Sequence, residues 1–172
     1  MHPRIAELLD YVETQTTALR EAYDAVPPER RGVRTEPSRW SAAEVVHHLA
    51  IVDRRLTMRL AALIEQARAL PAETETSSVL ADGLSKRAVD RTRRLVTSEA
   101  SEPRDTDPAN VWDELMETRH ELVRVVKTGD GLALGNVSAP HPALGQLTGY
   151  EWIAFVGAHA ARHADQIREM AG

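Results

Sequence analysis

The sequence contains no cysteine. This absence excludes disulfides, iron–sulfur clusters, cysteine-based zinc sites and a cysteine nucleophile, and it fits a reducing cytosol. The sequence also lacks any stretch of 18 apolar residues, so no transmembrane helix is predicted. The N-terminus carries no apolar run of the signal-peptide type. We therefore expect a soluble, cytoplasmic protein with no membrane partner.

A block of positive charge is missing as well. The formal net charge is −5, from 21 basic and 26 acidic residues, which argues against a nucleic-acid partner. Aromatic residues make up only 4 % of the chain, whereas Ala, Leu, Val, Arg and Glu are plentiful, and this mixture favours helices. The length of 172 residues suits one domain, 1–172, with a single core.

Apolar periodicity and chain breakers predict five helical segments. Ser41 with Glu44, and Thr148 with Glu151, form capping-box patterns at the starts of two of them. The segment 131–147 is rich in Gly and Pro and predicts a loop, and no strand alternation is evident. These features predict an all-α fold, a four-helix bundle with an additional short helical segment. The predicted helices are approximately 3–26, 41–70, 78–97, 107–127 and 148–170.

Two adjacent histidines in the second helix are not equivalent. A helix advances about 100° per residue. His48 therefore lies about 60° from Val45, at the edge of the apolar stripe, while His47 lies about 160° away and is expected to meet water. In the last helix, His159 and His163 lie one turn apart on the apolar face.

Imidazoles at positions i and i+4 can bind one metal ion. A third from a facing helix would give three nitrogen donors and leave a position open, as in catalytic sites. Such donors suit Zn²⁺, Ni²⁺ or another late divalent ion. The alternative is a set of core histidines that are satisfied by hydrogen bonds. Ala160 argues against the H-E-x-x-H protease signature.

Other polar residues have open roles. Asp53 and Gln166 are candidates to orient a ligand histidine by a hydrogen bond to the ring nitrogen that does not bind the metal. His141 lies in the predicted loop before the last helix, where it can shape a turn, line a pocket or contribute a further metal ligand. His2 and His120 are read as surface residues.

Two stretches resemble the DinB/YfiT-like superfamily. These are 40–49 (WSAAEVVHHL) and the series formed by 141–147 (HPALGQL), Glu151-Trp152 and 159–167 (HAARHADQI). The resemblance implies a four-helix bundle with an unusual connection order and a metal site on His48, His159 and His163. Some relatives join a low-molecular-weight thiol, of the bacillithiol or mycothiol type, to an electrophile, and a related branch is a mycothiol-dependent isomerase.

Three functional hypotheses follow. In the first, the protein is a metal-dependent transferase that binds one divalent ion, a small thiol and a small-molecule substrate. The second is a metal-dependent hydrolase. The third is a non-catalytic, stress-related protein that binds a metal or a small ligand. Homodimerisation is compatible with each of them.

Overall fold

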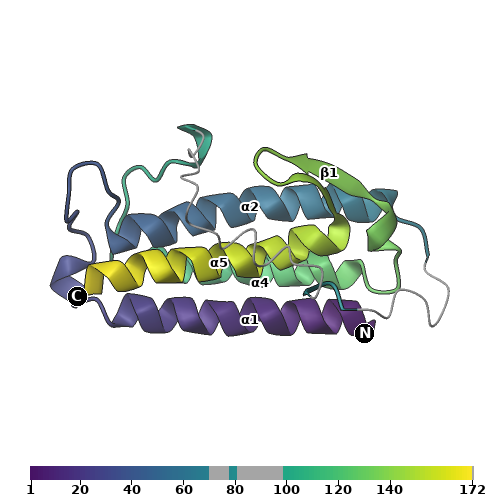
Figure 1. The fold of residues 1–172 in the computed structure, drawn as a ribbon, viewed down its shortest axis with the longest axis horizontal. Coiled ribbons are helices and arrows are strands. Elements are labelled where there is room, and N and C mark those ends of the chain that lie inside the picture. Colours follow the sequence, from purple (N-terminus) through teal and green to yellow (C-terminus); the bar gives the residue numbers. More distant parts are fainter. Residues whose placement is uncertain (70–77, 81–98, 172) are drawn as a thin grey trace.

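A computed structural model describes residues 1–69, 78–80 and 99–171. Within these residues the protein is mostly helical, with four long helices side by side and one small sheet (Figure 1). The elements are α1 (Pro3–Asp24), η1 (Pro28–Arg30), α2 (Ala42–Gln66), η3 (Glu99–Ser101), α4 (Val111–Thr128), η4 (Leu134–Asn136), β1 (Ser138–His141), β2 (Gly145–Thr148) and α5 (Gly149–Ala171). None of the helices in these described ranges combines the length and the hydropathy of a membrane span. Most of the predicted helix 78–97 lies outside the described residues.

The core is divided into two apolar clusters, one at each end of the long helices. One cluster joins the first half of α1 to the first half of α5 and to the C-terminal halves of α2 and α4. The other joins the second half of α1 and of α5 to the N-terminal halves of α2 and α4. Helices α1 and α5 therefore run in one direction, and α2 and α4 run in the opposite direction (Figure 1).

Both predicted capping boxes are present. Ser41 Oγ accepts a hydrogen bond from the Glu44 N–H at 3.2 Å, and the Glu44 carboxylate accepts one from the Ser41 N–H at 2.8 Å. Thr148 and Glu151 exchange the equivalent pair of bonds at 3.2 and 2.8 Å. Each box satisfies amides that the first helical turn leaves unpaired. These caps fix the starts of the two helices that carry the inward histidines.

The predicted loop 131–147 is partly wrong, because it contains an antiparallel hairpin. Strands β1 and β2 pair Ser138 with Thr148 and His141 with Gly145. Each strand has only four residues, too few to show a clear alternation of apolar and polar side chains. Gly145 has a φ of 81°, which favours glycine because a Cβ is strained there. The hairpin sets the direction from which the chain enters α5.

Two helix boundaries also differ from the prediction. Helix α2 ends at Gln66, four residues before the predicted end at about residue 70. Helix α4 begins at Val111 rather than at Asp107, because Asp107 organises a separate turn. Its carboxylate accepts hydrogen bonds from the Ala109 N–H at 3.0 Å and from the Asn110 side chain at 2.6 Å.

A buried ion pair lies between the two apolar clusters. Asp53 of α2 is fully buried, Arg119 of α4 is 3 % exposed, and the Arg119 Nε donates to the Asp53 carboxylate. Arg119 Nη1 also donates to Thr16 Oγ1 of α1 at 2.7 Å. Burial raises the pKa of the Asp53 carboxyl, and the neighbouring guanidinium acts against that effect. The pair joins three helices through one polar layer.

Removal of one partner of this pair is expected to be strongly destabilising. Asp53→Ala leaves a buried guanidinium uncompensated, which costs about 3–5 kcal/mol, whereas the double replacement Asp53→Leu with Arg119→Met recovers most of that loss. Chemical denaturation measures the free energy of unfolding of the single and the double variant. The surface pair of Glu121 and Arg124 is the control, and Arg124→Met should leave the melting temperature unchanged. Equal melting temperatures for Asp53→Ala and the wild type would contradict this account.

Candidate metal centre

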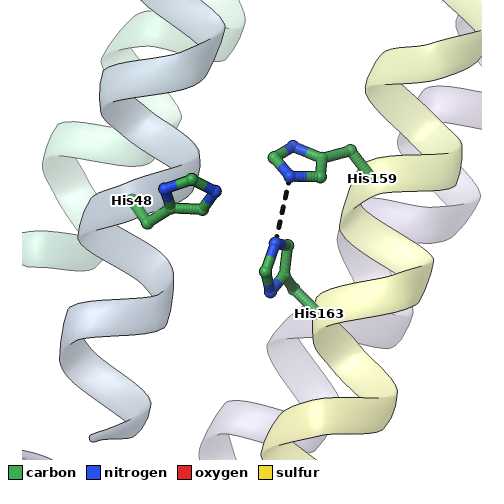
Figure 2. Close-up of side chains that lie close together, drawn as sticks. All are labelled: His48, His159 and His163. Carbon is green, nitrogen blue, oxygen red and sulfur yellow. Dashed lines mark hydrogen bonds between the residues drawn. The ribbon is translucent and has the colours of Figure 1, made fainter. Parts of the chain in front are cut away.

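Three histidines meet between α2 and α5. His48 projects from α2 toward His159 and His163, which project from consecutive turns of α5 (Figure 2). One ring nitrogen from each residue lies within 4.8 Å of the other two. His48 is 5 % and His163 is 7 % exposed. His159 keeps partial exposure, although its Nδ1 is fully enclosed.

Hydrogen bonds at Nδ1 orient two of the rings. His48 Nδ1 lies 2.7 Å from the Ser101 carbonyl oxygen, which only accepts, so Nδ1 of His48 carries the proton. His163 Nδ1 lies 2.8 Å from Gln166 Oε1, and the same argument places the proton there. In neutral imidazole the other nitrogen then keeps its lone pair. In the neutral form each ring therefore presents an unprotonated Nε2, which is the form that binds a metal ion.

The third ring has no comparable support. His159 Nε2 lies 3.0 Å from His163 Nε2. Because His163 Nε2 is unprotonated, His159 Nε2 must donate the proton of this bond. The Nδ1 of His159 is then an acceptor, and it is buried without a hydrogen-bond partner in the described part of the chain. Buried polar atoms without partners are uncommon, so the hydrogen-bonding capacity of the His159 ring is incompletely satisfied.

The spacing fits the donor set of a divalent ion. With metal–nitrogen bonds of about 2.0–2.1 Å, two ligands of one ion lie about 2.9–3.4 Å apart, and the two Nε2 atoms on α5 are 3.0 Å apart. The limit of 4.8 Å for the whole group is wider, so His48 would have to move slightly inward. The residues present therefore fit such an ion.

The surroundings favour the neutral forms of His48 and His159. Burial lowers the pKa of His48, with a smaller contribution from His47 in the same direction, while the Ser101 carbonyl opposes it. Burial also holds the pKa of His159 well below its usual value, and His163, His48, Arg119 and Arg162 add to this effect. Aromatic rings pack against two of the histidines: the Trp40 ring centre lies 4.9 Å from that of His48, and the Phe155 ring stacks on His159 with 5.2 Å between the ring centres.

The two adjacent histidines differ as predicted, although His47 is less exposed than predicted. His48 joins the cluster, and His47 does not. His47 is half-buried rather than exposed, because its Nδ1 bonds to Thr106 Oγ1 at 2.8 Å and its Nε2 lies 3.9 Å from Glu114. The chain before α4 and the start of α4 cover this side of α2, which a single-helix projection does not show.

The two residues proposed to orient ligand histidines have different outcomes. Gln166 contacts His163 as expected. Asp53 does not contact a histidine and instead pairs with Arg119. The sequence did not predict that the Ser101 carbonyl orients His48, because every residue has a backbone carbonyl and no residue type marks this one. Arg55 helps to hold it, because Arg55 Nη1 donates to Ser101 Oγ at 2.7 Å.

Outside the cluster, His141 lies in the hairpin against Trp152 and Phe155 and is not part of the three-histidine group. His120 is exposed, as predicted. His2 is only half-exposed, because its Nδ1 accepts a hydrogen bond from the Arg4 N–H at 3.3 Å and caps α1.

The fold and the site together define a class: a mostly helical protein with three inward histidines from two helices, positioned to bind a metal. The chain belongs to the DinB superfamily, whose model matches residues 7–167. It is also 25 % identical over 149 residues to the uncharacterized protein YuaE of Bacillus subtilis (strain 168), with 83 % of each chain covered. No solved structure gives a significant match.

The burial of neutral imidazoles predicts a loss of stability in acid. In the unfolded chain, histidine side chains bind protons with a pKa of about 6.5. In the folded protein, the pKa values of His48 and His159 are lower. Stability is therefore fully present above pH ~6.5 and decreases as the pH falls below it. For His159, the free energy of unfolding of chelator-treated protein should drop by about 1 kcal/mol from pH 7.5 to 5.5.

Urea denaturation at the two pH values measures this drop. His159→Gln should reduce it, whereas His120→Gln, at an exposed position, should leave it unchanged. The same pH dependence in His159→Gln as in the wild type would show that His159 is not buried in its neutral form.

Proposed function

We propose that the protein binds one divalent metal ion through His48, His159 and His163, and that it acts as a transferase joining a small thiol to an electrophilic substrate. The observation that carries the proposal is the convergence of one ring nitrogen from each histidine within 4.8 Å, with the Nδ1 of His48 and of His163 each held by a hydrogen bond. Zinc and nickel are the preferred ions, because three imidazoles suit late divalent metals.

The residues around the cluster have defined tasks in this proposal. The Ser101 carbonyl and Gln166 hold His48 and His163 in the tautomer that presents Nε2. Trp40 and Phe155 pack against His48 and His159, which limits ring rotation. Such support reduces the reorganisation needed when an ion enters.

The thiol must come from another molecule, since the chain has no cysteine. A divalent ion supplies Lewis acidity, which lowers the pKa of a thiol at an open position and favours the nucleophilic thiolate at neutral pH. Three protein ligands leave such a position. The low histidine pKa values support this proposal, because neutral rings do not need to lose a proton before they bind an ion.

The proposal includes the four-helix bundle, as the arrangement that brings α2 and α5 into contact. Cytoplasmic localisation and homodimerisation remain predictions. A native mass spectrum and sedimentation at several protein concentrations test homodimerisation.

Metal content tests the ligand set. Tag-free protein dialysed against Zn²⁺ or Ni²⁺ should retain about one equivalent, in line with a single site, and His163→Ala should lose it. His120→Ala is the matched control, because His120 is exposed on α4. Elemental analysis gives both values. Retention of the metal by His163→Ala, or none in the wild type, would contradict the site.

The hydrogen bond between His163 and Gln166 can be tested separately. Gln166→Leu removes the acceptor of the His163 Nδ1–H, and removal of such a partner lowers metal affinity by about 10–100-fold. Gln166→Glu keeps an acceptor and should retain most of the affinity. Gln66→Leu, at an exposed position of α2, is the control. Competition with a chromophoric chelator measures the affinities, and equal values for Gln166→Leu and wild type would refute the role.

Transferase activity is tested with N-acetylcysteine and 1-chloro-2,4-dinitrobenzene. In this reaction the thiol sulfur of N-acetylcysteine displaces chloride from the aromatic ring. Metal-loaded wild type should accelerate formation of the thioether, and chelator-treated protein and His48→Ala should not. A protein that binds metal but does not accelerate this reaction or that of other thiols and electrophiles would favour a non-catalytic metal-binding role.

A further inference from the structure

A second group of polar atoms lies beside the histidine cluster, on the face of α5 covered by the hairpin. Trp152 is 3 % exposed, and its indole Nε1–H is buried without an acceptor in the described part of the chain. His141 of β1 lies 5.4 Å from the Trp152 ring and 4.7 Å from the Phe155 ring. Phe155 in turn stacks on His159. The group is therefore one aromatic side chain away from the cluster.

The hairpin fixes the tautomer of His141. Its Nδ1 lies 3.1 Å from the Ala143 backbone nitrogen and 3.2 Å from that of Leu144. Backbone N–H groups only donate, so Nδ1 is the acceptor and Nε2 carries the proton. Burial, followed by the charge of Arg59, lowers the pKa of His141, which keeps the ring neutral at pH 7. His141 thus offers a single N–H donor at Nε2.

A positive charge completes the group. The Arg59 guanidinium lies 4.8 Å from the centre of the Trp152 ring, and its Nη1 donates to the Pro140 carbonyl at 3.0 Å. Within the described ranges, no carboxylate pairs with Arg59. Two neutral N–H donors and one cation are therefore gathered without an acidic partner of their own. A buried donor without an acceptor is costly, and a ligand oxygen would satisfy it.

We propose that His141, Trp152 and Arg59 form a subsite that binds the carboxylate of a small-molecule substrate beside the histidine cluster. This proposal rests on the proposed function, because the subsite would place a substrate next to the metal-binding histidines. Charged hydrogen bonds to a carboxylate are stronger than neutral ones. The subsite therefore selects anionic substrates over neutral molecules of the same shape.

Benzoate is the probe, and benzamide is its neutral counterpart of nearly equal shape. NMR of the full chain follows the Trp152 indole N–H, assigned with Trp152→Phe, and the imidazole nitrogens of His141. In free protein, His141 should carry its proton on Nε2. Benzoate should shift both signals along one saturable curve, in chelator-treated and in metal-loaded protein, and benzamide should bind at least about 10-fold more weakly.

Variants separate the contributions. His141→Asn keeps an acceptor for the Ala143 N–H but loses the distal donor, so it should retain the melting temperature and weaken benzoate binding about 10-fold or more. Arg59→Gln should also weaken it. The controls are His120→Asn and Arg54→Gln, since His120 is exposed and Arg54, on the same helix as Arg59, pairs with Glu114.

The outcomes distinguish this subsite from the metal site. The subsite is overturned if benzoate moves neither signal, if benzamide binds as well as benzoate, if His141 carries its proton on Nδ1, or if His141→Asn and Arg59→Gln bind benzoate like the wild type. Metal uptake without a benzoate response refutes the subsite alone. Benzoate binding in a protein that takes up no metal refutes the metal centre and leaves the subsite as a carboxylate-binding site.

Discussion

The structure depends on how imidazole rings are buried in an apolar interior. A buried polar ring must be neutral and must find hydrogen-bond partners. His48 and His163 find such partners in the Ser101 carbonyl and Gln166. His159 does not, because its Nδ1 is buried without a partner in the described chain. The interior thus holds two rings that are prepared for a ligand and a third that is incompletely satisfied, which is unusual for a purely structural core.

The same requirement shapes the rest of the core. The Asp53–Arg119 pair lies where the two apolar clusters separate, and Thr16 extends the polar layer to a third helix. Arg119 is also near enough to His159 to help lower the pKa of that ring. A second set of donors, around Trp152 and His141, lies on the other side of Phe155. Polar groups therefore continue along one face of α5, from the hairpin to Gln166.

Local patterns in the sequence predicted much of this arrangement. The capping boxes at Ser41 and Thr148 and the helical periodicity predicted α2 and α5, and the helical angle placed His48, His159 and His163 on inward faces. These features depend on residues within a few positions of one another. Gln166 was also identified correctly, because it lies three residues from His163 on the same helix.

Features that depend on distant partners could not be predicted in this way. The partner of Asp53 lies 66 residues away, and only packing of α2 on α4 brings the two together. The Ser101 carbonyl is a backbone atom 53 residues from His48. The hairpin strands are too short for an alternation to be recognised, so His141 was placed in a loop with several open roles.

A crystal structure of Zn²⁺-loaded protein, with anomalous diffraction measured at the zinc edge, tests the metal centre most directly. We expect one strong anomalous peak between α2 and α5, about 2.0–2.1 Å from a nitrogen of each of the three histidines. His48 should lie closer to the other two rings than in the present structure. No peak at this position, or a peak elsewhere such as beside His47 and Glu114, would contradict the assignment of these histidines as a metal centre.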